Sequence, residues 1–375
     1  MAALEELTEL AKAIENTAVS KWKAQGKPVV GYFCSYVPEE ILHAAGILPY
    51  RIKARGCAKT TAADTYLSSA MNCSFVRSCL DLALEGEYGF LDGVVSMNSC
   101  EHIRRAHDIW KRKVNIPYFH FLSVPHKTDE DAVEWYRDEL DEFKKSLENA
   151  FNVTITGEAL TDSIKVHNET RALLKKLYGF RRDDPPPITG AEALDVVVAA
   201  TSARKEDYNG LLKRVLEELS MREGASNHRS RLMVIGSVVD DPGYIKLIED
   251  LGAVVVTDNL CFGSRYFWEP VDTDADPLES LARSYLKRPI CPRMADEIAQ
   301  LYTYTRDMAE EFRVDGVILE RIRCCDLWGG ATLLLEKRLG EKGIPFLVID
   351  REYAMSGVGQ INTRVAAFLE MIGRD

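Results

Sequence analysis

The sequence lacks several features that would assign a function at once. No apolar stretch approaches the about 18 to 20 residues that a membrane-spanning helix needs. No block of lysine and arginine is interleaved with aromatic residues, and 58 acidic side chains outnumber 47 basic ones, which argues against nucleic acid as a partner. The first ten residues are acidic and amphipathic, unlike a signal peptide. We therefore expect a cytoplasmic protein that binds neither membrane nor nucleic acid.

Two nucleotide-binding motifs are also absent. The sequence has no Gly-x-x-x-x-Gly-Lys-Ser/Thr loop, which argues against ATP hydrolysis by this chain itself. No Gly-x-Gly-x-x-Gly follows the first expected strand, so dinucleotide binding has no support. The stretch SGVGQ at 356–360 would suit a phosphate held by backbone N–H groups at a helix start. A flexible helix start without a ligand accounts for Gly357 and Gly359 equally well.

The 375 residues are enough for two domains of ordinary size, and short runs rich in Val and Ile alternate with helical patterns in the first half and again in the last third. Such alternation is typical of buried parallel sheets joined by right-handed crossovers. The expected strands are residues 29–34, 47–53, 93–97, 117–123, 231–239, 253–258, 316–322 and 345–350.

Between these two regions, residues 129–222 read as helical and are broken once by the proline cluster at 183–187, which is a plausible domain boundary. We therefore predict an α/β protein with two Rossmann- or flavodoxin-like parallel-sheet domains and helical segments between them. The first domain would span residues 1–185 with a helical extension, and the second residues 186–375.

Four cysteine positions share a setting. Cys34, Cys100, Cys261 and the pair Cys324–Cys325 each follow an apolar run that reads as a buried strand and precede a helical pattern. The carboxyl ends of parallel strands form the ligand crevice of an α/β sheet, so these sulfurs can converge. A thiolate in the first turn of a helix is stabilised by unpaired N–H groups. The pattern indicates an iron–sulfur site, although a small buried apolar residue explains any single cysteine as well.

Zinc is the rival metal, and the spacing disfavours it. Structural zinc sites show Cys pairs separated by two to four residues, but here Cys73 and Cys79 are six apart and Cys324 and Cys325 are adjacent. No histidine forms an obvious pair with a cysteine. His102 and His107 follow Cys100, and we expect them at the surface or in support of a ligand.

Longer segments resemble the benzoyl-CoA reductase and 2-hydroxyacyl-CoA dehydratase family over almost the whole chain. The segments are GYFCSYVPEEILHAAG at 31–46, NCSFVRS at 72–78, NSCEHIRR at 98–105, DNLCFG at 258–263 and GQINTRVAAF at 359–368. Three further segments are most similar to the benzoyl-CoA reductase branch, namely CLDLALEGEY at 79–88, FLDG at 90–93 and HIRRAHDIW at 102–110.

The resemblance implies a cofactor and partners. Family members carry a four-iron four-sulfur (4Fe-4S) cluster on three cysteines that match Cys73, Cys100 and Cys325, with the fourth iron open toward an acyl-CoA thioester. Their low-potential electrons come from a separate iron–sulfur activator that hydrolyses ATP, and they pair with a homologous second subunit. Cys34, Cys261 and Cys291 match cysteines of the double-cubane branch, where two four-iron units share a bridging sulfide (8Fe-9S). Either cofactor is expected in the cleft between the domains.

The expected function is therefore that of an iron–sulfur oxidoreductase subunit that reduces an aromatic acyl-CoA such as benzoyl-CoA, as in anaerobic aromatic degradation. Two alternatives stay open: a 2-hydroxyacyl-CoA dehydratase subunit, which is a lyase, and an electron-relay double-cubane protein. We assign no catalytic residue and no cofactor-binding residue beyond the metal ligands.

Other residues have more than one interpretation each. Six aromatic residues either screen the cluster from water or belong to the ordinary core, and these are Phe75, Phe262, Tyr266, Phe267, Trp268 and Trp328. Arg77 and Arg104 lie one helical turn beyond Cys73 and Cys100, where they could tune the cluster, meet CoA phosphates or pair at a domain interface.

Overall fold

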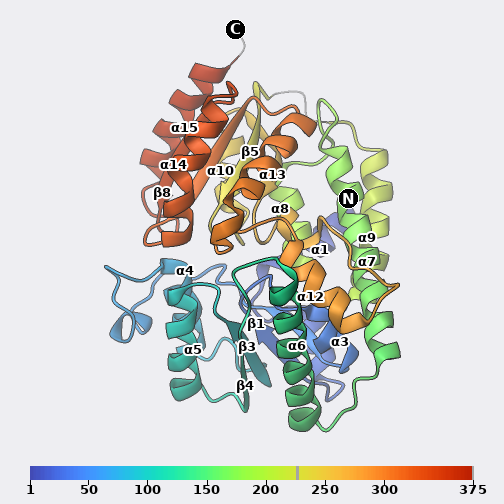
Figure 1. Cartoon of the computed structure of the whole chain (residues 1–375). Helices are drawn as coiled ribbons and strands as arrows, with labels where there is room; N and C mark the ends of the chain where they lie inside the picture. The colour runs from blue at the N-terminus through green and yellow to red at the C-terminus, as the bar shows by residue number, and fades with distance from the viewer. Residues whose placement is uncertain (225–227, 374–375) are drawn as a thin grey trace.

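The computed structural model describes residues 1–224 and 228–373 and contains two parallel four-stranded sheets (Figure 1). The first sheet has the order β2-β1-β3-β4 and the second β6-β5-β7-β8, so the two sheets repeat one topology. The predicted α/β fold with two parallel-sheet domains is confirmed. The strands are β1 (Val29–Tyr32), β2 (Leu48–Arg51), β3 (Gly93–Met97), β4 (Tyr118–Leu122), β5 (Ser230–Gly236), β6 (Ala253–Asn259), β7 (Gly316–Ile322) and β8 (Phe346–Arg351).

Several strands are buried along their whole length, including β6 at the edge of its sheet. Every residue of β1, β3, β5 and β6 is buried, which is why these strands show continuous Val and Ile runs rather than alternation. The strands β3 and β7 occupy the residues predicted for them, 93–97 and 316–322, and the other strands lie within three residues of their predicted bounds.

Helices connect the strands and fill the middle of the chain. The break at the prolines is confirmed, since one helix ends at Phe180 and the next begins at Gly190 with a capping box between Thr189 and Glu192. The helices are α1 (Ala2–Lys12), α2 (Thr17–Lys23), α3 (Glu39–Ala44), η1 (Ala63–Thr65), α4 (Ser74–Leu84), α5 (Glu101–Lys113), α6 (Glu130–Phe151), α7 (Gly157–Phe180), α8 (Gly190–Ala200), α9 (Lys205–Ser220), α10 (Gly243–Glu249), α11 (Ser264–Phe267), α12 (Pro277–Lys287), η2 (Ala295–Glu297), α13 (Ile298–Glu311), α14 (Asp326–Gly340) and α15 (Val358–Ile372).

The two sheets lie one above the other in Figure 1, with β5 and β8 in the upper half and β1, β3 and β4 in the lower half. The long helices α7 and α9 run together along one side of the molecule. The first helix, α1, packs against α8 and α9, and the Ala3 N–H donates to Glu218 Oε1 at 3.1 Å. The division of the chain at residue 185 stays a prediction.

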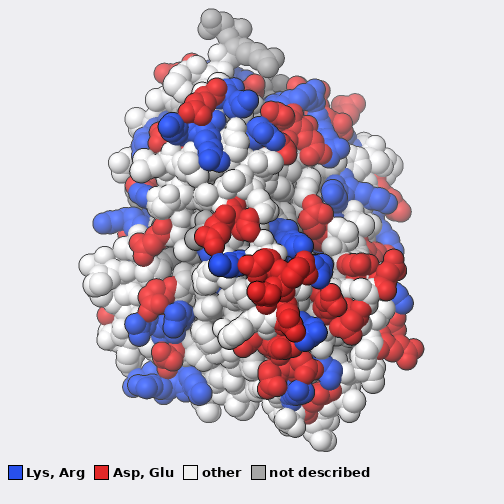
Figure 2. Space-filling model, viewed as in Figure 1, with Lys and Arg blue, Asp and Glu red and all other residues white. Residues whose placement is uncertain are grey.

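Charge is unevenly distributed over the surface. On the face drawn in Figure 2, acidic side chains gather over α6 and α12 in the lower half of the molecule. Among the helices of the described residues, none is both long and apolar enough to cross a membrane.

A glycine at the end of β5 sets the backbone geometry next to the site described below. Gly236 has φ +141°, and a Cβ added there would lie 1.9 Å from the Glu320 carbonyl oxygen. Only glycine therefore lets β5 run this close to β7. The next residue, Ser237, donates its N–H to the same carbonyl at 3.1 Å and begins the loop that leaves the sheet.

Candidate metal centre

Both sheets direct their switch points toward one cavity. The chain direction across the sheet reverses between β1 and β3 in the first sheet and between β5 and β7 in the second, and ligands of open α/β sheets bind outside the carboxyl ends of strands at such points. The segments that leave these four strands all line a single cavity of about 320 Å³. This volume lies at the lower end of the about 300–1,000 Å³ that ligand pockets cover. The fold thus forms a small cavity between its two halves.

Six of the nine cysteines line this cavity. They are the six that the sequence singled out as metal ligands: Cys34, Cys73, Cys100, Cys261, Cys291 and Cys325. The remaining three lie elsewhere: Cys79 is fully buried in the core of the first half, Cys57 donates to the Lys59 carbonyl at 3.0 Å, and Cys324 faces the Ala70 carbonyl at 3.5 Å. The role of the six as ligands stays a prediction.

Three of the lining cysteines, which we call the helix-start cysteines, are N-cap residues: Cys73 of α4, Cys100 of α5 and Cys325 of α14. Burial raises the pKa of Cys100 to about 12, although the N–H groups of Ile103 and His102 act in the opposite direction. Burial and the neighbouring Cys325 likewise raise the pKa of Cys73. Each thiolate therefore gains helix N–H donors, but the three as a group need a nearby positive charge to ionise.

The other three, which we call the loop cysteines, are Cys34, Cys261 and Cys291. The expectation that Cys34 and Cys261 directly precede helices is wrong, because α3 begins only at Glu39 and α11 at Ser264. The N–H of Ser264 donates to Asp258 at 2.7 Å, so an aspartate satisfies the start of that short helix. Cys291 lies in the segment between α12 and η2.

Electrostatic coupling links some of the thiols within each set. The pKa of Cys73 is raised by burial, by Cys325 and by Cys100, whereas the pKa of Cys34 is raised by burial and by Cys291. Coupling also links the two sets, since, in addition to burial, Cys34 raises the pKa of Cys100 and Cys291 raises the pKa of Cys325. Coupling between thiols of the cavity thus occurs both within and between the two sets.

This donor set fits an iron–sulfur cluster better than a single ion. Within residues 1–224 and 228–373, no three His, Cys, Asp or Glu side chains converge closely enough to hold one metal ion. The thiols instead surround a space, as the ligands of a multi-iron cluster must. Thiolates are soft ligands that select zinc, copper(I) or iron–sulfur clusters, and a set of six around one cavity matches the last of these.

Several lining residues had no signal in the sequence. Three arginines, Arg51, Arg265 and Arg293, reach the cavity from separate segments, and no spacing or motif marks them. His102 lines the cavity too, and its Nε2 lies 2.7 Å from the Cys324 carbonyl oxygen, so it donates a hydrogen bond between the two halves. This contact agrees with the supporting role expected for it, whereas His107 is buried against Phe119 and Phe121.

The expected aromatic screen is only partly present at the cavity. Phe75 and Trp328 line it, but the other four aromatic residues expected there do not. Phe267 and Trp268 pack against Tyr178 with ring centroids 4.8 Å and 6.1 Å away, because α11 turns them toward α7. Phe262 stacks on the Arg51 guanidinium, and Tyr266 donates to Glu39 at 3.1 Å. Phe33 and Tyr36 line the cavity in their place.

Neither arginine that follows a helix-start cysteine lines the cavity. Arg77 is buried and pairs with Asp64 at 2.6 Å and, across the two halves, with Glu352 at 3.8 Å, which supports its reading as an interface residue. Arg104 is 58% exposed and lies 3.9 Å from Glu101. Gly357 is the N-cap of α15 with φ +79°, and phosphate binding there stays a prediction.

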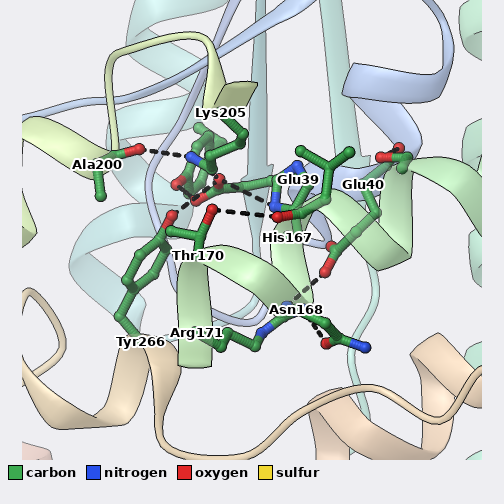
Figure 3. A network of polar contacts seen from close by, with 12 residues as sticks. Glu39, Glu40, His167, Asn168, Thr170, Arg171, Ala200, Lys205 and Tyr266 are labelled. Atoms are coloured by element: carbon green, nitrogen blue, oxygen red, sulfur yellow. Dashed lines mark hydrogen bonds and ion pairs between the residues drawn. The ribbon is translucent and has the colours of Figure 1, made fainter. Parts of the chain in front are cut away.

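A buried network of charges fixes the loop that carries Cys34. Figure 3 shows Glu39, the first residue of α3, between Lys205, His167 and Tyr266. The Lys205 Nζ lies 2.7 Å from Glu39 Oε2, and the neighbouring Glu40 pairs with Arg171 of α7. Because both glutamates follow the Cys34 loop directly, the network holds this side of the cavity against α7 and α9.

Comparison with known proteins gives a consistent family. A family model described as 2-hydroxyglutaryl-CoA dehydratase, D-component, matches residues 34–372. The benzoyl-CoA reductase of Thauera aromatica contains a subunit that is 29% identical over 342 residues, which cover 89% of this chain and 88% of that protein. The (R)-2-hydroxyglutaryl-CoA dehydratase subunit beta of Acidaminococcus fermentans is 26% identical, with 99% and 100% covered. Lactoyl-CoA dehydratase subunit beta of Anaerotignum propionicum is also 26% identical, with 99% of each chain covered.

Among solved structures, a crystal structure of SsGBP with GDP aligns over 92% of this chain and 99% of that chain. The TM-score is 0.25 and the sequence identity 10%, so this alignment carries no weight for fold or function.

Proposed function

This chain belongs to the 2-hydroxyglutaryl-CoA dehydratase D-component family, and we propose that it is an iron–sulfur oxidoreductase subunit with two four-iron units held by six cysteines. One observation carries the proposal: six cysteines that are scattered from residue 34 to residue 325 line one cavity at the switch points of both sheets. Six lining thiols, three at helix starts and three in loops, suit two neighbouring units with three protein ligands each.

In this proposal the helix-start cysteines hold one unit and the loop cysteines hold the other. When bound, such a cofactor would supply single electrons at low potential. The chain contributes the surroundings: Phe33, Phe75 and Trp328 keep water away, and helix N–H groups stabilise the thiolates at Cys73, Cys100 and Cys325.

We propose an aromatic acyl-CoA such as benzoyl-CoA as the substrate. This choice rests on the reductase-like segments at 79–88 and 102–110 and on the likeness to the T. aromatica protein. The partners would be a homologous second subunit and an ATP-hydrolysing iron–sulfur activator. Two facts support them: the relatives are named as subunits, and the chain has no Gly-x-x-x-x-Gly-Lys-Ser/Thr loop.

A second candidate function is electron relay without an acyl-CoA substrate. The cavity favours it because the six cysteines already occupy its walls, so two cluster units and an aromatic ring would compete for about 320 Å³. A third candidate is a 2-hydroxyacyl-CoA dehydratase, a lyase, which the names of two relatives favour.

Electron counting separates these candidates. A reductase consumes two electrons for each product molecule, so reductant use should match product formation with benzoyl-CoA. A dehydratase should turn over a 2-hydroxyacyl-CoA many times after one priming reduction. A relay protein should itself be reduced and reoxidised in the presence of the activator, without converting either thioester.

Iron and sulfide analysis of protein purified without oxygen tests the cofactor itself. Two four-iron units predict about eight irons per chain. Cys34→Ser and Cys261→Ser should each lower this value to about four, because each removes one ligand of the loop-cysteine unit, and Cys57→Ala should not change it. A wild-type value of about four that Cys34→Ser and Cys261→Ser leave unchanged would establish a single unit. Protein free of iron would refute the proposal.

A further inference from the structure

Three arginine side chains lie in the wall of the cysteine cavity and are almost completely buried. Arg51 ends β2, Arg265 lies in α11, and Arg293 follows Cys291 by two residues. Their exposed fractions are 1%, 3% and 1%. We call them the cavity arginines.

No carboxylate pairs with the cavity arginines in the part of the chain that the structure describes. Arg51 donates to the Cys261 carbonyl, Arg265 to the Gly236 carbonyl at 3.3 Å, and Arg293 to the Val124 and Pro125 carbonyls at 2.9 Å and 2.8 Å. Burial raises the pKa of Glu320 and the charge of Arg265 acts against this shift, but this carboxyl group is already paired with Arg351 at 2.7 Å.

Several N–H groups of these guanidinium ions have no acceptor among the described residues. They are the Nε of all three side chains and, in addition, Nη1 of Arg265. Two other buried arginines differ, because Arg171 and Arg351 each form an ion pair with a buried glutamate. A buried charge without a counter-charge is strongly unfavourable, so the arrangement requires negative charge nearby.

The thiols of the lining cysteines act on Arg265 and Arg51, and the Glu39 carboxylate also acts on Arg51. Burial alone would lower the pKa of Arg265, but the thiolates of Cys291 and Cys261 outweigh it and raise the pKa. Burial and the thiolate of Cys261 act on the pKa of Arg51 in the same opposed way, and the net shift is again upward. Both arginines thus face the loop cysteines.

We propose that Arg51, Arg265 and Arg293 form a cationic cage that neutralises excess thiolate charge and raises the reduction potential of the adjacent iron–sulfur unit. The inference rests on the proposed function and names the part of the wall that controls the potential. Reduction adds one negative charge to the unit, and a fixed positive charge in a dry, low-dielectric wall stabilises the reduced state more than the oxidised state. Removal of a cavity arginine should therefore make the potential more negative.

Arg265→Gln tests this in the whole protein, purified without oxygen, with iron and sulfide analysis and a mediator-assisted redox titration followed by electron paramagnetic resonance. We expect iron content to stay at the wild-type value and the reduction equilibrium to shift at least about tenfold toward the oxidised state. For one electron this is a midpoint about 59 mV more negative. Arg265→Lys keeps the charge, so its midpoint should lie close to the wild-type value.

Arg231→Gln is the matched control. Arg231 is buried to a similar degree, but its guanidinium donates to the Phe312, Arg181 and Asp183 carbonyls instead of facing the cavity. Its loss should leave the midpoint unchanged.

The outcomes separate this inference from the proposed function. Wild-type protein without iron would refute the function itself. Full iron content in Arg265→Gln together with a wild-type midpoint would refute the cage alone. If Arg265→Gln loses iron while Arg265→Lys retains it, the positive charge is needed for assembly, which supports the cage. If both variants lose iron equally, the side chain acts through its shape and the cage is refuted.

Discussion

The ion pair between Arg171 and Glu40 offers a direct test of how the Cys34 side of the cavity is held. Both side chains are buried, with 7% and 0% of their surface exposed, and Glu40 also accepts a hydrogen bond from Tyr285 at 2.7 Å. Arg171→Met would leave the Glu40 carboxylate in the interior without its cation. Breaking a buried pair in this way costs about 3–5 kcal/mol.

Urea unfolding followed by circular dichroism measures this loss, and two further variants define its origin. Arg171→Met with Glu40→Gln removes both charges together and should recover most of the lost stability. Arg222→Met removes a partly exposed pair with Glu192 at 3.0 Å and should cost only about 0–1 kcal/mol. A loss for Arg171→Met no larger than that of Arg222→Met would refute the reasoning.

The same pair predicts a dependence on pH. Burial alone would raise the pKa of Glu40, but the Arg171 guanidinium outweighs burial and holds the pKa below its ordinary value. A carboxyl group with a lowered pKa in the folded state contributes stability above its unfolded pKa of about 4.3 and loses that contribution as the pH falls through the folded pKa. The difference between wild type and Arg171→Met should therefore shrink in acid, and a difference that grows below about pH 4 would contradict this.

Three further predictions concern the cofactor and its partners. Alanine at any helix-start cysteine should abolish assembly of that unit, because metal binding at such sites is coupled to ligand number. Iron and sulfide analysis checks this, with Cys57→Ala as the control. Full iron content in all three variants would reject the assignment. His102→Ala should keep the wild-type iron content, because the contact of His102 with the Cys324 carbonyl joins the two halves without binding metal. Its free energy of unfolding in urea should fall by about 1 kcal/mol. Loss of iron in this variant would make His102 a ligand. The isolated chain should hydrolyse no ATP in a phosphate-release assay, and multiple turnovers should appear only after an activator is added. Robust hydrolysis by the chain alone would reject the proposal that a separate activator hydrolyses the ATP.

The amino-acid sequence determined where the helices and strands lie and which cysteines are candidate metal ligands. Strand positions followed from local runs of Val and Ile, which is why β3 was predicted at its observed residues and the helix break fell at the prolines before Gly190. The resemblance to a family distinguished six cysteines from the other three, and these six line the cavity. Such signals are short-range or lie in fixed motifs, so a sequence carries them without a structure.

Only the tertiary structure decided what surrounds those cysteines. The pairing of two switch points depends on how two sheets pack, which no local pattern encodes. Cys324 and Cys325 are adjacent in sequence, yet the positive φ of 67° at Cys324 turns it away while Cys325 caps α14. Arg51 and Arg293 are far apart in the chain and become neighbours of one cavity only through long-range packing. Whether an arginine is buried and whether it has a partner are properties of the folded environment, and this is why the cationic wall of the site could not be predicted.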